Sequence, residues 1–329
     1  MSNLERRPAE TPTGGLATVS PEPTRQLLTP REVPLGGPRA MLVRRTLPHR
    51  EIRTVGAWCF LDDYGPASGT DPGMVVPPHP HTGLQTVTWL LSGEVLHQDS
   101  LGSEQIVRPG SLSLMTAGRG ISHAETSTST SPDLRGVQLW VALPDPSRDT
   151  AADFEHHGQL PVLRAGDLTA TVLLGPLGDV RSPATTFTPI VGADLSVRNG
   201  GGTVPLEAAW EHAVLALTGD VVVDGEPVPQ GALAYLGCGR DRLEVRSDGG
   251  DARALLLGGE PFEEQLLMWW NFVGRTHDEV AAAREEWMTA VGGADTRFGH
   301  VPAYDGPALP APALPGTRLR PRGRGPHTS

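Results

Sequence analysis

The sequence predicts an all-β protein made of two tandem jelly-roll β-barrels, with a C-terminal helix and an extended tail. The chain has 329 residues, more than a single hydrophobic core usually serves, which favours two domains. Its 40 glycines and 32 prolines separate short apolar runs in the way that turns separate antiparallel strands. The third observation is an internal repeat, which indicates that both domains share one architecture.

The repeat relates residues 86–125 to residues 213–246. Gly93 matches Gly219 at an offset of 126, and Gly110 matches Gly231 at an offset of 121. The second copy has therefore lost five residues in the hairpin between these glycines, where a deletion is tolerated. Each copy contains three strands separated by turns, an order typical of a small jelly-roll barrel.

The domain boundaries follow from composition. We expect residues 1–37, which are rich in Pro, Thr, Glu and Gly, to be largely disordered because they offer little apolar surface to bury. After them we expect a first barrel over residues 38–180, a second over residues 181–275, a helix over residues 276–293 and a tail over residues 294–329.

The helix has clear end signals. Thr276 and Glu279 form a capping box, an Ala-rich run follows, and Gly292 ends it. One face is apolar: Val280, Ala283, Trp287 and Val291. The tail is rich in proline and arginine, which predicts an extended conformation.

Charge and cysteine content exclude several classes of protein. The 38 acidic and 27 basic residues give a net charge of -11, which argues against direct binding of nucleic acid. We interpret the tail arginines as surface anchors or solubilising groups: Arg318, Arg320, Arg322 and Arg324. No segment approaches the roughly 20 apolar residues of a membrane span. Two cysteines, Cys59 and Cys238, are too few for a disulfide framework, so we expect a cytoplasmic protein. We also expect the protein to be a monomer.

Two pairs of polar residues in the first copy indicate a metal site. His79 and His81 precede its first long strand, and His123 and Glu125 follow its last turn. Residues i and i+2 of a strand share a face, so each pair directs two side chains the same way. Three imidazoles and a carboxylate suit a divalent first-row metal. A lone His-x-His pair is more often incidental, but two such pairs at the ends of strands in one repeat favour a metal site.

The same offsets assign four counterparts to the second copy: Pro205, Glu207, Glu244 and Arg246. Proline and arginine cannot replace imidazole ligands. We therefore expect the second barrel to be metal-free and to have a structural or interfacial role.

Several ordered motifs resemble the pirin family of bicupin proteins. They are HPHTGLQTVTWLLSGEVLHQDSLG, IVRPGSLSLMTAGRGISHAE, VGAWCFLDDYGP, GVQLWVALP, WWNFVGRTHDEV and TRLRPR, and the resemblance extends from about residue 38 to 322. It implies one iron, first of all Fe(II), held by His79, His81, His123 and Glu125, whereas Mn, Ni, Cu and Zn also accept this ligand set. Ala124 stands where the family more often has Ser. Gln85 stands where Glu is usual, which removes a possible carboxylate near the metal.

The resemblance leaves two functions open. One is a dioxygenase that opens flavonols such as quercetin, with a small aromatic substrate, O2, and Glu125 as the base that takes the substrate hydroxyl proton. The other is a non-catalytic, iron- or redox-dependent regulatory protein that binds a protein partner in transcription or metabolism. An open apolar cavity leading to the metal favours the first, and a shut one the second. A sugar-binding or isomerase cupin is disfavoured, because it would need a further His or Lys base.

Other candidate residues receive weaker assignments. We assign no role to His97, which we expect to be hydrogen-bonded or exposed, and we expect His156 and His157 to lie in a surface loop. Arg119 either orients an anionic substrate or caps a turn. Four tryptophans in apolar runs are expected in the core or between the barrels: Trp89, Trp140, Trp269 and Trp270.

Overall fold

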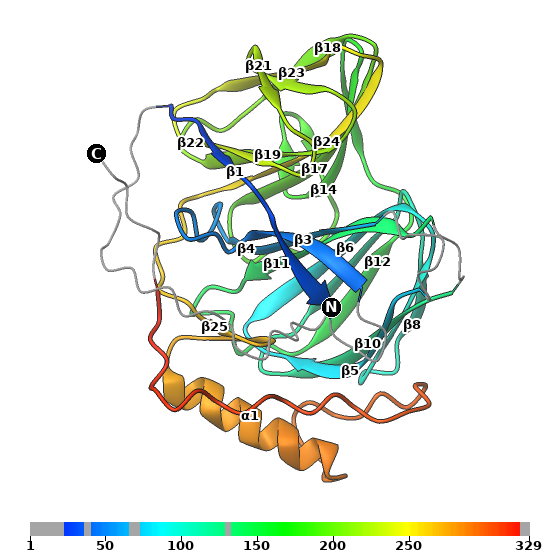
Figure 1. The fold of residues 1–329 in the computed structure, drawn as a ribbon, viewed down its shortest axis with the longest axis vertical. Helices are drawn as coiled ribbons and strands as arrows, with labels where there is room; N and C mark the ends of the chain where they lie inside the picture. Colours follow the sequence, from blue (N-terminus) through cyan, green and yellow to red (C-terminus); the bar gives the residue numbers. More distant parts are fainter. Residues whose placement is uncertain (1–22, 36–40, 66–72, 129–132, 323–329) are drawn as a thin grey trace.

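The computed structural model describes residues 23–35, 41–65, 73–128 and 133–322, and it confirms the two-barrel architecture (Figure 1). Each barrel pairs a seven-stranded antiparallel sheet with a four-stranded one. In Figure 1 the second barrel lies above the first, and the C-terminal helix lies below both. The fold is a bicupin, as the internal repeat predicts.

The first barrel is formed by two sheets. The larger sheet has the order β12-β9-β6-β11-β4-β3-β2, with bounds Asp153–His157, Leu112–Thr116, Leu84–Ser92, Arg135–Ala142, Trp58–Tyr64, Met41–Leu47 and Arg31–Leu35. The smaller has the order β5-β10-β7-β8, with bounds Val75–His81, Ile121–Ser127, Val95–Asp99 and Glu104–Val107. The two candidate ligand pairs lie on the neighbouring strands β5 and β10.

The second barrel repeats this plan. Its larger sheet has the order β1-β22-β19-β24-β17-β14-β13, with bounds Gln26–Leu28, Leu233–Gly237, Glu211–Thr218, Asp251–Gly259, Ile190–Arg198, Leu168–Leu174 and Val162–Ala165. Its smaller sheet has the order β18-β23-β20-β21, with bounds Gly201–Pro205, Arg242–Ser247, Val221–Val223 and Glu226–Val228. Two short hairpins complete the strands: β15 (Pro176–Leu177) with β16 (Val180–Arg181), and β25 (Leu267–Trp269) with β26 (Phe272–Gly274).

Two predicted boundaries need correction. Strands β13 and β14 pair with each other, and β14 pairs with β17, so residues 162–174 belong to the second barrel although the sequence placed them in the first. Within the segment expected to be disordered, residues 23–35 contain β1 and β2, while residues 1–22 and 36–37 lie outside the described part. β1 pairs with β22 of the second barrel and β2 with β3 of the first, so this short segment joins both barrels.

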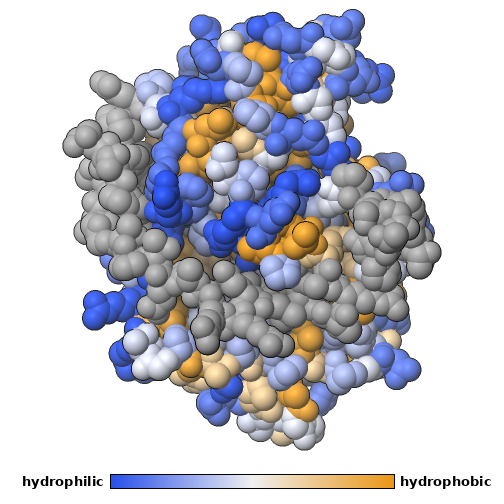
Figure 2. All heavy atoms as spheres, in the orientation of Figure 1, coloured by the Kyte–Doolittle hydropathy of each residue, from blue (hydrophilic) through white to orange (hydrophobic). Residues whose placement is uncertain are grey.

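The two large sheets pack against each other through an apolar core. This core combines side chains from both barrels, among them Trp58, Trp89, Trp140, Leu215 and Leu257. The Trp58 indole donates across the interface to the carbonyls of Val191 and Gly258 at 3.1 and 3.2 Å. The four tryptophans assigned to packing are buried, as predicted. Figure 2 shows one face of the molecule, on which hydrophilic residues predominate and apolar residues form separate patches.

The helix α1 (His277–Val291) begins and ends where the sequence predicts. Thr276 is its N-cap and accepts a hydrogen bond from the amide of Glu279 at 3.2 Å, and Gly292 is the C-cap. Its buried face packs with β25, β26 and the tail. In the described part of the tail, residues 294–322 form no helix and no strand beyond an isolated bridge between Leu266 and Arg322. Arg324 lies outside the described residues.

Candidate metal centre

Strand β5 presents His79 and His81 from a stiff edge. Its sequence VVPPHPH contains three prolines, which lack the amide proton that a central strand needs, and β5 accordingly lies at the edge of the smaller sheet. The pyrrolidine rings fix φ around both histidines. Both imidazoles are 0% exposed. The strand therefore holds two ligand candidates inside the barrel with little freedom to move.

Strand β10 is paired on both sides. His123 lies opposite His79 on β5 and opposite Asp99 on β7. Glu125 lies opposite His97 on β7, and the register with β5 shifts between His123 and Glu125. This irregularity separates Glu125 from the row that contains His79 and His123.

The protonation of His79 and His81 follows from their hydrogen-bond partners. Nδ1 of His79 lies 2.9 Å from the carbonyl oxygen of Pro77, and Nδ1 of His81 lies 3.1 Å from that of Asn271. A carbonyl only accepts, so each Nδ1 carries the proton. Burial lowers the pKa of both side chains well below its ordinary value, so they are neutral at pH 7 and each Nε2 keeps a lone pair.

The three imidazoles converge on one point. Nε2 of His81 lies 3.1 Å from Nε2 of His123, and one nitrogen from each of His79, His81 and His123 lies within 4.8 Å of the other two. Nε2 of His79 is buried without a hydrogen-bond partner. Burial also lowers the pKa of His123 well below its ordinary value. Three neutral imidazoles with facing lone pairs and an unpaired buried nitrogen fit a cation, which would satisfy all of them at once.

Glu125 lies beside this cluster. Its carboxylate is within 4.8 Å of ligand atoms of His123 and His97, in a second group that shares His123 with the first. The side chain is 1% exposed, and Oε1 accepts a hydrogen bond from the hydroxyl of Thr88 at 3.3 Å. The same hydroxyl lies 3.0 Å from Oε1 of Gln138, and its single proton can serve only one acceptor at a time. Glu125 is therefore adjacent to His123, and it shares the hydroxyl of Thr88 with Gln138.

His97 and Asp99 lie beside the histidine cluster, although the sequence analysis assigns no role to His97. His97 is hydrogen-bonded, as expected, and is 3% exposed. Its Nε2 lies 3.1 Å from Oδ2 of Asp99, and its Nδ1 lies 3.4 Å from Nδ1 of His123. Burial raises the pKa of Asp99, but hydrogen bonds from His97 and Ser103 outweigh it and hold that pKa below its ordinary value. A His-x-Asp pattern on one strand face was the available signal.

Two family models match the chain. The pirin model covers residues 40–141, and the model of the pirin C-terminal cupin domain covers residues 193–292. The chain belongs to the pirin family. Human pirin is 30% identical over 260 residues, which are 76% of this chain and 88% of that protein.

Two bacterial relatives of the family are more similar. A Pseudomonas aeruginosa protein named "Putative quercetin 2,3-dioxygenase" is 44% identical over 293 residues, covering 88% of this chain and 90% of its own. The crystal structure of quercetin 2,3-dioxygenase from Acinetobacter baumannii has 42% sequence identity and a TM-score of 0.83, and covers 90% of this chain and 97% of its own.

The second pirin barrel has a different interior. Glu207 and Glu244 are exposed, and Arg246 pairs with Asp248 near the surface. The residues that the sequence alignment matches to the metal ligands of the first barrel therefore face outward in the second barrel. The interior positions of β23 are Leu243 and Val245, one residue away. The correspondence is therefore displaced by one residue, which in a strand exchanges the two faces. Among the described interior positions on β18 and β23, Val204, Leu243 and Val245 are aliphatic, and Ser247 carries a buried hydroxyl.

One titratable group in the second barrel gives a stability prediction. His212 alternates along β19 with Val214 and Ala216 of that barrel's core, and burial, with a smaller effect from Arg240, lowers its pKa to about 4. The unfolded chain binds a proton at this side chain below about pH 6.5, whereas the folded protein does so only near pH 4. Stability is therefore lost as the pH falls through this window. Between about pH 7.5 and 5 the loss from this residue is about 2 kcal/mol.

The variant His212→Leu should remove that part of the pH dependence. Free energies of unfolding from chemical denaturation near pH 7.5 and pH 5 measure it in both proteins. The buried histidines of the first barrel contribute equally to both and cancel in the comparison. An unchanged pH dependence in the variant would contradict the assignment.

Arg119 and Gln85 lie apart from the histidine cluster. Arg119 is exposed and lines a cleft of ≈ 270 Å³ with Arg148, Arg297 and residues of α1, and none of the four predicted ligands lines this cleft. Gln85 donates to the hydroxyl of Thr116 at 3.0 Å and to a backbone carbonyl, and contacts no predicted ligand through these bonds.

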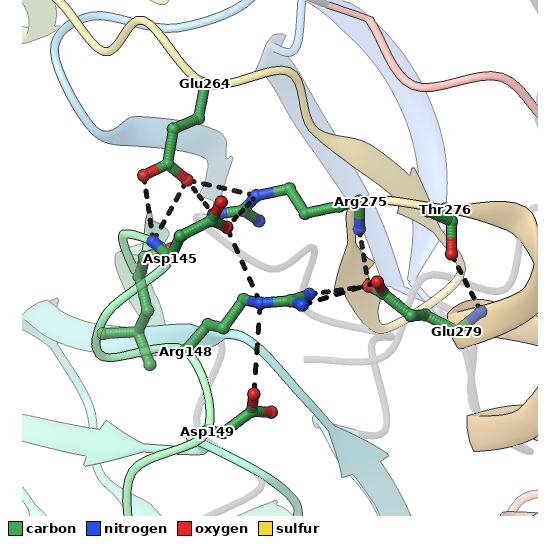
Figure 3. Close-up of polar contacts among 8 residues, drawn as sticks. Asp145, Arg148, Asp149, Glu264, Arg275, Thr276 and Glu279 are labelled. Atoms are coloured by element: carbon green, nitrogen blue, oxygen red, sulfur yellow. Dashed lines mark hydrogen bonds and ion pairs between the residues drawn. The ribbon is translucent and has the colours of Figure 1, made fainter.

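A polar network beside the cleft fixes α1 to the first barrel (Figure 3). Arg148 pairs with Glu279 at 2.7 Å, and Glu279 also accepts from the amide of Arg275 at 2.9 Å. Arg275 in turn pairs with Asp145 at 2.8 Å and with Glu264. The Glu279 carboxylate thus accepts hydrogen bonds from Arg148 and Arg275, while the amide of Glu279 donates to the N-cap residue of the helix.

No helix in the described residues has the length and apolarity to span a membrane.

Proposed function

We propose that the first barrel holds one divalent metal ion, Fe(II) in the first instance, through His79, His81, His123 and Glu125. The protein would then be a dioxygenase that opens flavonols of the quercetin type. The observation that carries this proposal is the convergence of three neutral imidazoles, two of them with Nε2 atoms 3.1 Å apart. The two bacterial relatives named for quercetin 2,3-dioxygenase support the substrate class.

Bound there, such an ion would supply Lewis acidity and, for iron, one-electron chemistry with O2. The chain's own residues would position and deprotonate the substrate. Glu125 would accept the proton of a flavonol hydroxyl at a carboxylate oxygen, close to the hydroxyl of Thr88 that donates to its Oε1. The exchange requires Glu125 to release the metal, or to bind it loosely, while it holds the proton.

Two further groups fit an oxygen-rich substrate. The hydroxyl of Tyr64 and the amide nitrogen of Gln138 are buried without hydrogen-bond partners. Burial, and then the charge of Glu125, raises the pKa of Tyr64 well above its ordinary value, so the hydroxyl stays protonated and can donate. Both groups lie in the barrel with Glu125, where a substrate with several oxygens would satisfy them.

The reaction can be tested stepwise with metal-loaded protein. Elemental analysis of protein purified without chelators identifies the metal. Anaerobic addition of quercetin should shift its absorption spectrum, and admission of O2 should then consume the shifted species. The variant Glu125→Gln should lower turnover by roughly 10²–10⁴-fold, the usual contribution of a general base. A metal-loaded protein that produces no spectral shift would exclude the enzyme.

One observation favours the regulatory alternative. The four proposed ligands are only 0–1% exposed, so the centre is closed in this conformation. The tail covers the smaller sheet through Leu309, whose amide donates to the carbonyl of Pro78 at 2.8 Å, and through Ala303, whose carbonyl accepts from Gln98 at 3.0 Å. An iron protein that only presents a surface to a partner would need no opening, and the anaerobic quercetin experiment separates the two functions.

A further inference from the structure

We propose that Asp99 and His97 are positioning residues that fix the tautomer of His123, so that its Nε2 lone pair faces the metal. This inference rests on the proposed metal site but concerns residues outside the ligand set. It assigns a role to a buried chain of three side chains, Asp99, His97 and His123, that leads from a surface loop to the histidine cluster.

The directions of the hydrogen bonds in this chain follow from the carboxylate of Asp99 together with a His97 that carries one ring proton. A carboxylate only accepts, so Nε2 of His97, 3.1 Å from Oδ2 of Asp99, carries a proton. The proposal places this single proton on Nε2 of His97 and a lone pair on its Nδ1, which lies 3.4 Å from Nδ1 of His123. His123 must donate from Nδ1, and its Nε2 is left with the lone pair that faces His81 at 3.1 Å.

Both positioning side chains are held in place. Oδ1 of Asp99 accepts from the amides of Leu101 and Ser103 at 2.9 and 3.0 Å, which turns Oδ2 toward His97. The ring of His97 stacks on Phe154 with centroids 4.2 Å apart and an interplanar angle of 9°. The Asp99 side chain is 0% exposed and that of His97 is 4% exposed, so water does not compete for these bonds.

His123 differs from His79 and His81 in the group that accepts its Nδ1 proton. The Nδ1 protons of His79 and His81 go to backbone carbonyls of Pro77 and Asn271. Those tautomers are set by the main chain and cannot be changed by substituting the acceptor. The tautomer of His123 alone depends on side chains, so a change at Asp99 should act on His123 and leave His79 and His81 as they are.

The variant Asp99→Asn is the sharpest test because it keeps the shape of the side chain, removes its charge and replaces one acceptor oxygen by an NH2 donor. The carboxamide oxygen should keep the two loop amides, so its NH2 group would face His97. His97 would then accept a hydrogen bond at Nε2 and donate one from Nδ1. His123 would therefore carry its proton on Nε2, and that nitrogen would have no lone pair for a metal. Metal affinity should fall by about 10–100-fold, as for other outer partners of ligand histidines.

Two readouts separate this proposal from the proposed function. Long-range ¹H–¹⁵N spectra of metal-free protein with ¹⁵N-labelled histidine report the tautomer of His123, assigned by the loss of its signals in His123→Gln. We expect the Nδ1–H form in the wild type and the Nε2–H form in Asp99→Asn. This result does not depend on which metal binds, or on any turnover. Competition with a chelator then gives the affinity for Fe(II) or Ni(II).

Glu104→Gln is the matched control, because it neutralises a carboxylate in the same hairpin that contacts Gln98 instead of His97. It should leave the tautomer and the affinity unchanged. An Nε2–H tautomer in the wild type, or an unchanged tautomer in Asp99→Asn, would overturn the proposal. So would a His97→Phe variant that loses metal as completely as a ligand variant, because His97 would then be a ligand. A wild type that binds no metal but shows the expected tautomers would refute the proposed function alone.

Discussion

Replacement of His81 by alanine is expected to remove most of the bound metal while the protein stays folded. The substitution deletes one of three converging imidazoles, and the remaining two nitrogens and one carboxylate bind a divalent ion much more weakly. The fold should persist because the aliphatic and aromatic side chains that form the core between the barrels and the core of the second barrel stay in place. Elemental analysis gives the metal content, and thermal unfolding followed by circular dichroism gives the stability.

Two control variants make the result specific. Glu244→Ala changes an exposed side chain on β23 of the second barrel. His156→Ala removes a histidine that hydrogen-bonds Ser113; His156 and His157 lie in strand β12, paired with β9, and the prediction of a surface loop for them was wrong. Both should keep full metal content. Full occupancy in His81→Ala would remove this residue from the ligand set, and a fall to one half in Glu244→Ala would show that the second barrel also binds metal.

The sequence could predict the histidine cluster because the spacing of the residues within each strand shows which side chains share a face. The alternation of a strand places His79 with His81, and His123 with Glu125, on common faces. Whether two pairs meet depends on strand pairing, which the repeat made plausible. The roles of His97 and Asp99 required the register of β10 against β7, which sets His123 opposite Asp99 and Glu125 opposite His97. No pattern within either strand contains that register.

The errors in the second barrel have a related cause. Glycine turns aligned the two copies, but a deleted hairpin shifts the offset between its two sides, and an error of one residue exchanges the inner and outer faces. Glu244 and Arg246 were thus assigned in place of Leu243 and Val245. The boundary near residue 180 failed because β13 and β14 look like any other strands, and only their pairing with β17 shows their barrel.

Loss of the Arg45 charge is expected to cause the largest fall in stability. Nε and Nη2 of Arg45 donate to the two carboxylate oxygens of Asp62 at 2.7 and 2.8 Å, and the two side chains are 1% and 0% exposed. Arg45→Met keeps most of the aliphatic stem but leaves Asp62 as an unpaired buried carboxylate. We expect a loss of about 3–5 kcal/mol in the free energy of unfolding, measured by chemical denaturation at neutral pH.

The double variant Arg45→Met with Asp62→Leu shows whether the unpaired charge is the cause. Replacing both partners of a buried ion pair by apolar side chains is often neutral or stabilising, because the cost of desolvating two charges disappears with their attraction. We therefore expect the double variant to recover most of the loss. An equally low stability in both variants would instead assign the effect to packing, because the Arg45 guanidinium lies 4.4 Å from the ring centroid of Phe60, which stacks on Trp140 at 4.0 Å. Trp140 in turn meets His81 edge-on at 5.2 Å, so in that case metal content should fall together with stability.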